Sequence, residues 1–566
     1  MPTENFSLLH PENSKAVYRK LTNEAINDLS VDFICEALSE DSFERNSIKQ
    51  LLINITSDEE TIRYRCDVFE DFLRFPQLRE DLMRVLAKLK DLKDIERFQK
   101  DQESSSLWQL VNRLRELDAY VDCITGIKNT LEAIDVHSDG LISLRKRVTE
   151  IFESSGFPIL KKDIEETLGE VRRVKSITLG VNLDDLLRPK SVGVVSLNDA
   201  HFTDSGLLKK FLNFASKQGE LNHTTEVAGF LSYHPANPST SGFGLGALAM
   251  GAQQDIHHVE NSSLTGADPM SDALKKVVTD ILKRTVNNLK AMLNKYVGNS
   301  GYTFISLMPE IIFYIRFAEL CEKIKAKGMP LCKAEVAAKE DRMCSAKDIY
   351  NIKLAMRPES TEIVTNDFDF DDTKRIYILT GPNRGGKTTV TQAVGLAFLL
   401  AQNGIYVPAN SMKFSPCDNI FTHFPADEND TVDLGRLGEE SKRLAEIFEK
   451  ATRYSLLLLN ESLATTNVAE GLYIARDVVK AMRYLGVRAV FNTHMHDLAR
   501  GLDEINSSTE GDSIIESMVT GVENGQRSFK VFIAPPQGVS YAKDIAQKYG
   551  VTFDLIKKSI DNKKAE

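Results

Sequence analysis

The stretch "ILTGPNRGGKTT" constrains the fold more than any other part of the chain. It places Gly381, four further residues, and then Gly386, Lys387 and Thr388 between an apolar segment and a helical one. This is the phosphate-binding loop pattern, in which glycines let backbone N–H groups turn toward phosphate oxygens and the following helix contributes its positive end. A glycine turn that only joins a strand to a helix is the alternative, and the complete pattern in this context argues against it.

The residues of this loop are the candidate nucleotide-binding residues. Lys387 is expected to contact the β- and γ-phosphates of ATP, and the Thr388 hydroxyl is expected to bind Mg²⁺. The full predicted set is Gly381, Pro382, Asn383, Arg384, Gly385, Gly386, Lys387, Thr388 and Thr389. ATP and Mg²⁺ are therefore the predicted cofactors.

The run "SLLLLNES" has the pattern of a buried strand that ends in polar residues, Asn460 and Glu461. A nucleoside triphosphatase normally has an aspartate for the metal here, followed by a glutamate. Glu461 is the predicted general base, and Asn460 could still hydrogen-bond a metal-bound water although one negative charge is missing. Weaker Mg²⁺ binding and slower turnover are the hypothesis. A strand with a merely polar end is the alternative, and the phosphate-binding loop makes a catalytic role the better interpretation.

A second apolar segment, "AVFNTHMHDLA", ends in Thr493 and His494, with His496 two residues further on. A histidine at the end of a sheet strand is well placed to sense a γ-phosphate. Taken alone, either histidine would more often be a structural hydrogen-bonding group. We assign His494 to the site and leave His496 structural or unassigned.

Composition limits the class of protein. The chain has 566 residues, more than one hydrophobic core can use, and a net charge of -11 that argues against coating nucleic acid by bulk attraction. Its seven cysteines form no close pair or zinc cluster, which predicts reduced structural thiols. No apolar run is long enough to span a bilayer, and the amino terminus lacks a signal-peptide pattern. The predicted location is cytoplasmic, associated with the nucleoid, or nuclear in a eukaryote, without a membrane partner.

The pattern of apolar residues changes along the chain. Helical periodicity dominates from residue 14 to about 345 and is interrupted by strand-like segments at 176–199 and by a Gly-, Pro- and Ser-rich stretch at 234–269, which predicts a mobile loop. After residue 348, the strand-like runs "RIYILT", "YSLLLLN", "RAVFNT" and "SFKVFIA" alternate with helical segments. Such alternation predicts a largely parallel sheet covered by helices.

Four segments together resemble the ATPase domain of the MutS family, the ABC-type ATPases of DNA mismatch repair and their relatives. They are "TGPNRGGKTT", "ATRYSLLLLNES", "NTHMHDLA" and "PPQGVSYAKDIAQKYGVTFDLIKKSI", and residues 56–98 are similar to the helical core of that family. The resemblance implies a multidomain protein: a mainly α-helical core with long lever helices and a small β-containing clamp-like tip, followed by an α/β ABC-type P-loop ATPase domain. The expected boundaries are 1–120 and 301–350 for the core, 121–300 for the levers and tip, and 351–566 for the ATPase domain.

The chain also departs from the family pattern. Only about fifty residues precede the core, and neither a Phe-x-Glu wedge nor a nuclease-like extension is found, so mismatch recognition is not expected. The signature serine would fall at about Gly435, and the aromatic residue that stacks on adenine is replaced by Ile363. Together with Asn460, these changes put the rate of ATP hydrolysis and the affinity for the adenine base in question. The resemblance further implies a homodimer, because ABC-type sites are completed by a second subunit.

Two hypotheses for the partner remain open. The segment "ALKKVVTDILKRTVNNLKAMLNKYV" carries Lys275, Lys276, Lys283, Arg284 and Lys290 with a single acidic residue, Asp280. Such a helix could follow a phosphate backbone, although a solvated helix face would look the same. The first hypothesis is a dimeric ATPase clamp on duplex or branched DNA. The second is a nucleotide-gated scaffold with little hydrolysis on another nucleic-acid or ribonucleoprotein partner.

Overall fold

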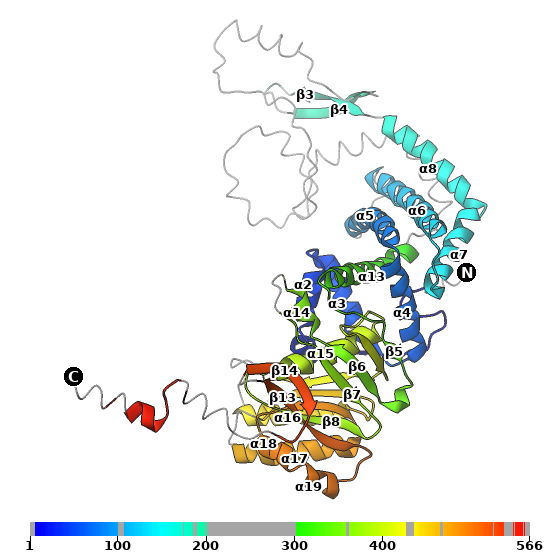
Figure 1. Cartoon of the computed structure of the whole chain (residues 1–566). Coiled ribbons are helices and arrows are strands. Elements are labelled where there is room, and N and C mark those ends of the chain that lie inside the picture. Colours follow the sequence, from blue (N-terminus) through cyan, green and yellow to red (C-terminus); the bar gives the residue numbers. More distant parts are fainter. Residues whose placement is uncertain are drawn as a thin grey trace. The chain divides into compact units, whose positions relative to one another are not determined.

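In the computed structural model, the apolar segment before the phosphate-binding loop forms β8 (Lys374–Thr380), an inner strand of a six-stranded sheet (Figure 1). The strand order is β10-β11-β12-β8-β13-β14. The other strands are β10 (Ile420–His423), β11 (Leu456–Asn460), β12 (Arg488–Asn492), β13 (Ile514–Glu523) and β14 (Gln526–Ile533). All neighbouring pairs are parallel except β13 and β14, which pair antiparallel. The prediction of a largely parallel sheet is confirmed.

The structure describes residues 6–99, 107–173, 175–183, 185, 189–198, 200, 302–357, 362–425, 435–463, 468–523, 526–536, 547, 549–557 and 560. The predicted loop at 234–269 and the basic residues Lys275, Lys276, Lys283, Arg284 and Lys290 lie outside these ranges. Within them, no helix is long and apolar enough to cross a membrane. All seven cysteines fall inside these ranges and are free thiols.

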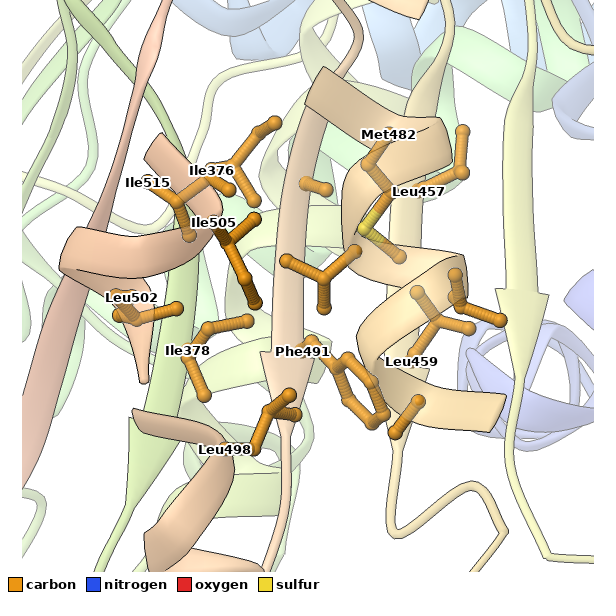
Figure 2. Close-up of a cluster of buried hydrophobic side chains, with 14 of the residues drawn as sticks. Ile376, Ile378, Leu457, Leu459, Met482, Phe491, Leu498, Leu502, Ile505 and Ile515 are labelled. Atoms are coloured by element: carbon orange, nitrogen blue, oxygen red, sulfur yellow. The ribbon is translucent and has the colours of Figure 1, made fainter. Parts of the chain in front are cut away.

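One face of the six-stranded sheet is covered by α17 (Val468–Leu485), α18 (His496–Arg500) and α19 (Leu502–Ser508). Figure 2 shows the apolar cluster between them, in which Leu457, Leu459 and Phe491 of the sheet face Met482 of α17 and Leu498 of α18. Alternate residues of β11 enter this cluster because successive strand side chains point to opposite faces. The four leucines of this strand are therefore buried on both faces of the sheet.

The opposite face is covered by α15 (Lys387–Gln402), which follows the phosphate-binding loop. Thirteen of its 16 residues are buried, so the helix has almost no solvent-facing side. Gly395 allows this close packing, because a β-carbon built on it would lie 2.6 Å from Cδ1 of Leu458 on β11 and 2.7 Å from Cδ2 of Leu29 in the amino-terminal helices. The helix is therefore enclosed between the sheet and the helical core.

A second, four-stranded sheet lies beside the first, with the order β5-β9-β6-β7. Its strands are β5 (Glu335–Val336), β9 (Ser411–Phe414), β6 (Cys344–Ile349) and β7 (Asn366–Phe370). None of these strands was predicted from the sequence. They are short, and β7 alternates buried and exposed residues in the segment "NDFDF".

The helical part precedes the α/β part in sequence. Its elements are β1 (Tyr18–Lys20), α1 (Asn23–Asp28), α2 (Val31–Leu38), α3 (Ser42–Leu52), β2 (Asn54–Thr56), α4 (Glu59–Arg74), α5 (Pro76–Gln99), α6 (Leu107–Ala133), α7 (Asp139–Glu153), α8 (Gly156–Arg173), β3 (Ser176–Leu183), β4 (Pro189–Asn198) and α13 (Tyr302–Ala326). The short elements η2 (Lys339–Asp341) and α14 (Ile352–Met356) follow, and α16 (Gly435–Lys450) lies in the α/β part. Strands β3 and β4 pair antiparallel where strands were predicted at 176–199.

The chain divides into two compact units. The first contains Met1–Arg84, Ile127–Val148 and Thr303–Glu566, and the second contains Val85–Gly126 and Thr149–Tyr302. Both sheets with their helices, α1 to α4 and nearly all of α13 belong to the first unit. The second unit holds α8, the β3–β4 pair and the adjoining parts of α5 and α6.

Buried hydrogen bonds join the end of α15 to the helical core within the first unit. A guanidinium N–H of Arg65 donates to the carbonyl of Gln402 at 3.4 Å and to Oδ1 of Asn403 at 3.2 Å. Asn403 in turn donates from Nδ2 to the carbonyl of Leu52 at 3.0 Å, and Gln402 donates from Nε2 to the carbonyl of Thr56 at 2.8 Å. These bonds hold the carboxyl end of α15 against α3, β2 and α4.

The amino-terminal segment is attached to α13 through a partly buried carboxylate. Glu310 accepts hydrogen bonds from the backbone N–H of Leu8 at 2.6 Å and from the Ser7 hydroxyl at 2.9 Å. Burial raises the pKa of Glu310 to about 7, although these two donors and the charge of Arg65 oppose the shift. The folded protein therefore keeps a proton on Glu310 to a higher pH than the unfolded chain does.

The raised pKa of Glu310 predicts a pH-dependent effect of Glu310→Gln. Because the folded-state pKa is higher than the unfolded value, the stability that Glu310 contributes is complete below the unfolded pKa and is lost as pH rises through about 7. The neutral glutamine avoids this loss. Glu310→Gln should therefore become more stable relative to wild type as pH rises. Between about pH 5 and about pH 8, the difference in unfolding free energy should increase by about 2 kcal/mol. Melting temperatures of the two proteins across this pH range measure the effect.

The control is Glu340→Gln, which replaces an exposed carboxylate of η2. Its effect on the melting temperature should stay the same across this pH range. If the difference in melting temperature between Glu310→Gln and wild type does not change with pH, the raised pKa of Glu310 is contradicted.

Candidate nucleotide site at the carboxyl ends of the strands

The phosphate-binding loop has the backbone conformation that its glycines predict. Gly381 and Gly386 have φ of 147° and 91°, values that favour glycine, and Arg384 between them has φ of 60°. A β-carbon on Gly381 would lie 2.0 Å from Oγ1 of Thr520 on β13, so a larger residue there would force the loop and β13 apart. The loop thus requires glycine both for its turn and for its close approach to β13.

The side chain of Lys387 lies within this loop. It is 4% exposed, and its Nζ donates to the carbonyls of Gly381 at 3.1 Å and Pro382 at 3.2 Å. Burial lowers the pKa of Lys387, and the negative charge of Glu461 opposes the shift. A bound phosphate would supply the negative charge that favours the ammonium form.

The hydroxyl of Thr388, at the start of α15, donates to Oδ1 of Asn460 at 2.9 Å. The same oxygen accepts from Nδ2 of Asn492 at 2.7 Å. Asn460 and Asn492 are paired residues at the ends of the parallel strands β11 and β12, which explains why they meet. The structure therefore brings the two predicted metal-site residues, Thr388 and Asn460, together and adds Asn492, which sequence analysis missed.

The two predicted catalytic residues also meet. Nε2 of His494 lies 2.8 Å from Oε1 of Glu461, and both side chains are about one third exposed. Glu461 has φ of 51°, and its N–H donates to the carbonyl of Asn492 at 2.8 Å. This turn after β11 places a partly solvated carboxylate next to the Asn460 and Thr388 pair, where it could accept a proton from a bound water.

The remaining predicted residues have distinct positions. Asn383 and Arg384 are exposed on the loop, Gly385 is buried, and Thr389 is partly buried in the first turn of α15. His496 begins α18, and burial lowers its pKa. Gly435 is the first residue of α16.

Behind Glu461, a buried histidine that was not predicted supports the turn. Nδ1 of His423, at the end of β10, lies 2.6 Å from the Ser462 hydroxyl, which also donates to the His423 carbonyl at 3.1 Å. Burial lowers the pKa of His423 to about 4, with a further contribution from the charge of Arg443. The backbone N–H of Leu463 donates to Glu440 of α16. No sequence signal beyond the end of a short strand marks this histidine.

The oxygen groups at this site fit Mg²⁺. The Thr388 hydroxyl and the Asn460 carboxamide oxygen are hard ligands that lie together beside a phosphate-binding loop. Among the described residues, no cluster of three or more His, Cys, Asp or Glu side chains could hold a metal. Mg²⁺ commonly keeps several waters and takes few protein ligands when phosphates bind it as well. The site fits Mg²⁺ with a nucleotide better than a metal held by protein alone.

Comparisons with known proteins cover both parts of the chain. The family model for MutS domain V matches residues 377–548, and the model for the MutS2 N-terminal domain matches residues 57–327. The first of these matches includes the loop, Asn460, Glu461 and His494.

Individual relatives match over shorter stretches. An Endonuclease MutS2 of Thermus thermophilus is 28% identical over 213 residues, which are 37% of this chain and 27% of that protein. A DNA mismatch repair protein MutS of Chlorobium phaeobacteroides is 30% identical over 257 residues, 45% of this chain and 28% of that protein. A DNA mismatch repair protein MutS of Chlorobium chlorochromatii is 32% identical over 199 residues, which are 35% of this chain and 22% of that protein. The matches span about a quarter of the length of these relatives.

The position of Asn460 predicts how Asn460→Asp should behave. The asparagine is 6% exposed, so a carboxylate at this position would be costly without a cation. We expect a lower melting temperature without ligand, and an Mg²⁺ requirement for nucleotide binding that falls about tenfold because hydrogen bonds to charged groups are stronger. Mg²⁺ titrations of nucleotide binding and thermal melts measure the two effects.

Asn460→Ala is the matched variant, because it removes the oxygen without adding charge. Its Mg²⁺ requirement should rise. If Asn460→Asp and Asn460→Ala shift the requirement in the same direction, Asn460 has no part in the metal site.

Proposed function

Since the chain belongs to the MutS family, we propose that it binds ATP with Mg²⁺ and hydrolyses it. The observation that carries this proposal is the convergence of two polar pairs, Thr388 with Asn460 and Glu461 with His494, beside a lysine held in the phosphate-binding loop. In parallel sheets, ligands bind at the carboxyl ends of the strands, and these residues follow β8, β11 and β12.

Each residue has a chemical role in this proposal. The loop N–H groups and the Lys387 ammonium group bind the phosphates, while Thr388 binds Mg²⁺ directly and Asn460 through a water. Mg²⁺ supplies positive charge that neutralises the phosphate oxygens. Glu461 takes a proton from the water whose oxygen bonds to the γ-phosphorus as the bond to the β-phosphate oxygen breaks, and the products are ADP and phosphate.

His494 links this chemistry to the presence of the γ-phosphate. Its Nε2 lies 2.8 Å from the Glu461 carboxylate. A γ-phosphate oxygen would compete for the same N–H group, which would release Glu461 to contact water. His494 thus acts as the γ-phosphate sensor.

We further propose that the protein acts on DNA as a homodimeric clamp in the cytoplasm at the nucleoid, or in the nucleus of a eukaryote. Support comes from two of the relatives described above, a DNA mismatch repair protein and an endonuclease. Long helices such as α6 and α8, together with the β3–β4 pair, are suitable for levers and a tip, and the basic segment with Lys275, Lys276, Lys283, Arg284 and Lys290 would follow the phosphate backbone. Duplex or branched DNA is the partner in this proposal.

The test is steady-state, Mg²⁺-dependent ATP hydrolysis by the full chain, with and without duplex DNA. Wild type should turn over, and Glu461→Ala should reduce the rate by about 100-fold or more, the usual cost of losing a general base. Asn460→Asp should hydrolyse ATP faster than wild type. Glu449→Ala, which removes an exposed carboxylate of α16, should hydrolyse ATP like wild type.

Two outcomes would decide against parts of the proposal. If wild type hydrolyses ATP no faster than Glu461→Ala and Asn460→Asp restores hydrolysis, the nucleotide-gated scaffold is favoured. ATP-dependent retention on DNA that falls steeply with salt supports the clamp, whereas nucleotide-dependent dimerisation without any shift of DNA would contradict it.

A further inference from the structure

An exposed phenylalanine lies against the phosphate-binding loop from the edge strand β14. Phe529 is 43% exposed, yet a β-carbon built on Gly386 would lie 3.3 Å from its Cδ1 atom. Gly386 is the residue that immediately precedes α15. The ring therefore touches the loop and leaves a large part of its apolar surface open to solvent.

The position of Phe529 is imposed by a bulge in the β13–β14 pair. Thr520 pairs with Val531 and Val522 pairs with Arg527, so three residues of β14 lie opposite Gly521 alone. Phe529 is the middle residue of the three and has φ of 56°, which is unusual for an aromatic residue. Bulges of this kind redirect a side chain, and here Phe529 is redirected toward the loop.

Hydrogen bonds from the start of β7 fix this conformation. The carboxamide of Asn366, 3% exposed, donates from Nδ2 to the Phe529 carbonyl at 3.3 Å and accepts from the Val531 N–H at 2.8 Å. Nζ of Lys530 donates to the carbonyl of Thr365 at 2.6 Å. The segment that contains Ile363 is thereby tied to the bulge of β14.

An open aromatic face beside a phosphate-binding loop suits the base of a nucleotide. Bases stack on aromatic side chains, and Ile363 offers only an aliphatic group on the neighbouring segment. We propose that Phe529 stacks on the adenine of ATP and that the β14 bulge exists to present it. This inference rests on the proposed nucleotide binding at the same loop, and it identifies Phe529 as a residue that determines affinity for the base.

The same strand provides a matched control. Phe532 is 45% exposed, but its ring lies at Gly521 of β13, where a β-carbon would be 3.0 Å from Cε1, and not at the loop. Both phenylalanines are exposed residues of one edge strand. Their truncation removes similar apolar surface, and only Phe529 contacts the loop.

The experiment compares the binding of Mg²⁺–ATP and Mg²⁺–tripolyphosphate by equilibrium titration of the full chain. Phe529→Ala should weaken ATP binding about tenfold, the usual effect of losing one base–aromatic stack, and should leave tripolyphosphate binding unchanged. Phe529→Trp should retain ATP affinity, and Phe532→Ala should match wild type for both ligands. Melting temperatures verify that each variant is folded.

The outcomes separate this inference from the proposed function. Wild type that binds neither ligand would overturn the proposed nucleotide site itself. If wild type binds ATP and Phe529→Ala has unchanged affinity for both ligands, or equally reduced affinity for both, base stacking alone is overturned. Tighter binding of both ligands by Phe529→Ala would also overturn it, because the ring would then be a cover over the loop.

Discussion

The burial of α15 is the constraint on which the rest of the structure depends. Thirteen of the 16 residues of this helix are buried, and Gly395 lets Leu458 of the sheet and Leu29 of the helical core approach it from two sides. Its first residues complete the phosphate-binding loop, and its end is held by Arg65 through Gln402 and Asn403. A tightly packed helix transmits displacement because its surroundings leave no space for independent movement. A shift of the loop would therefore be felt in α1, α3 and α4.

Parallel strand order determines the chemistry of the site. Because β8, β11 and β12 end at one edge of the sheet, the groups that follow them meet beside the start of α15 without any long-range loop. Asn460 lies at the centre of this arrangement and accepts from both Thr388 and Asn492. An asparagine there accepts both hydrogen bonds without a buried negative charge. In the proposed function, the neutral oxygen of Asn460 would bind Mg²⁺ more weakly than a carboxylate, and the partly solvated Glu461 would still act as the base.

Much of this could be predicted where the signal is local. The glycine spacing of the loop and the apolar run of β11 pointed to the candidate site, because both follow from backbone and burial requirements within a few residues. The four-stranded sheet was missed because β5 has only two residues and β9 only four, although the alternation in β7 was a usable signal. Phe529 was missed because a bulge in β14 determines where its side chain lies. His423 and Ser462 were missed because they meet only through a contact between segments that are distant in sequence. The DNA clamp formed by lever helices and the basic segment stays a prediction.

The most direct test of the central claim is equilibrium binding of ATP with Mg²⁺ to wild type and to Lys387→Ala. Lys387 lies inside the loop, 3.1 Å from the Gly381 carbonyl, so its removal should weaken ATP binding at least about tenfold, as expected for the loss of a charged hydrogen-bond partner. Lys480→Ala, on the exposed side of α17, should leave the affinity unchanged. Equal affinities of wild type and Lys387→Ala would contradict a nucleotide site at this loop.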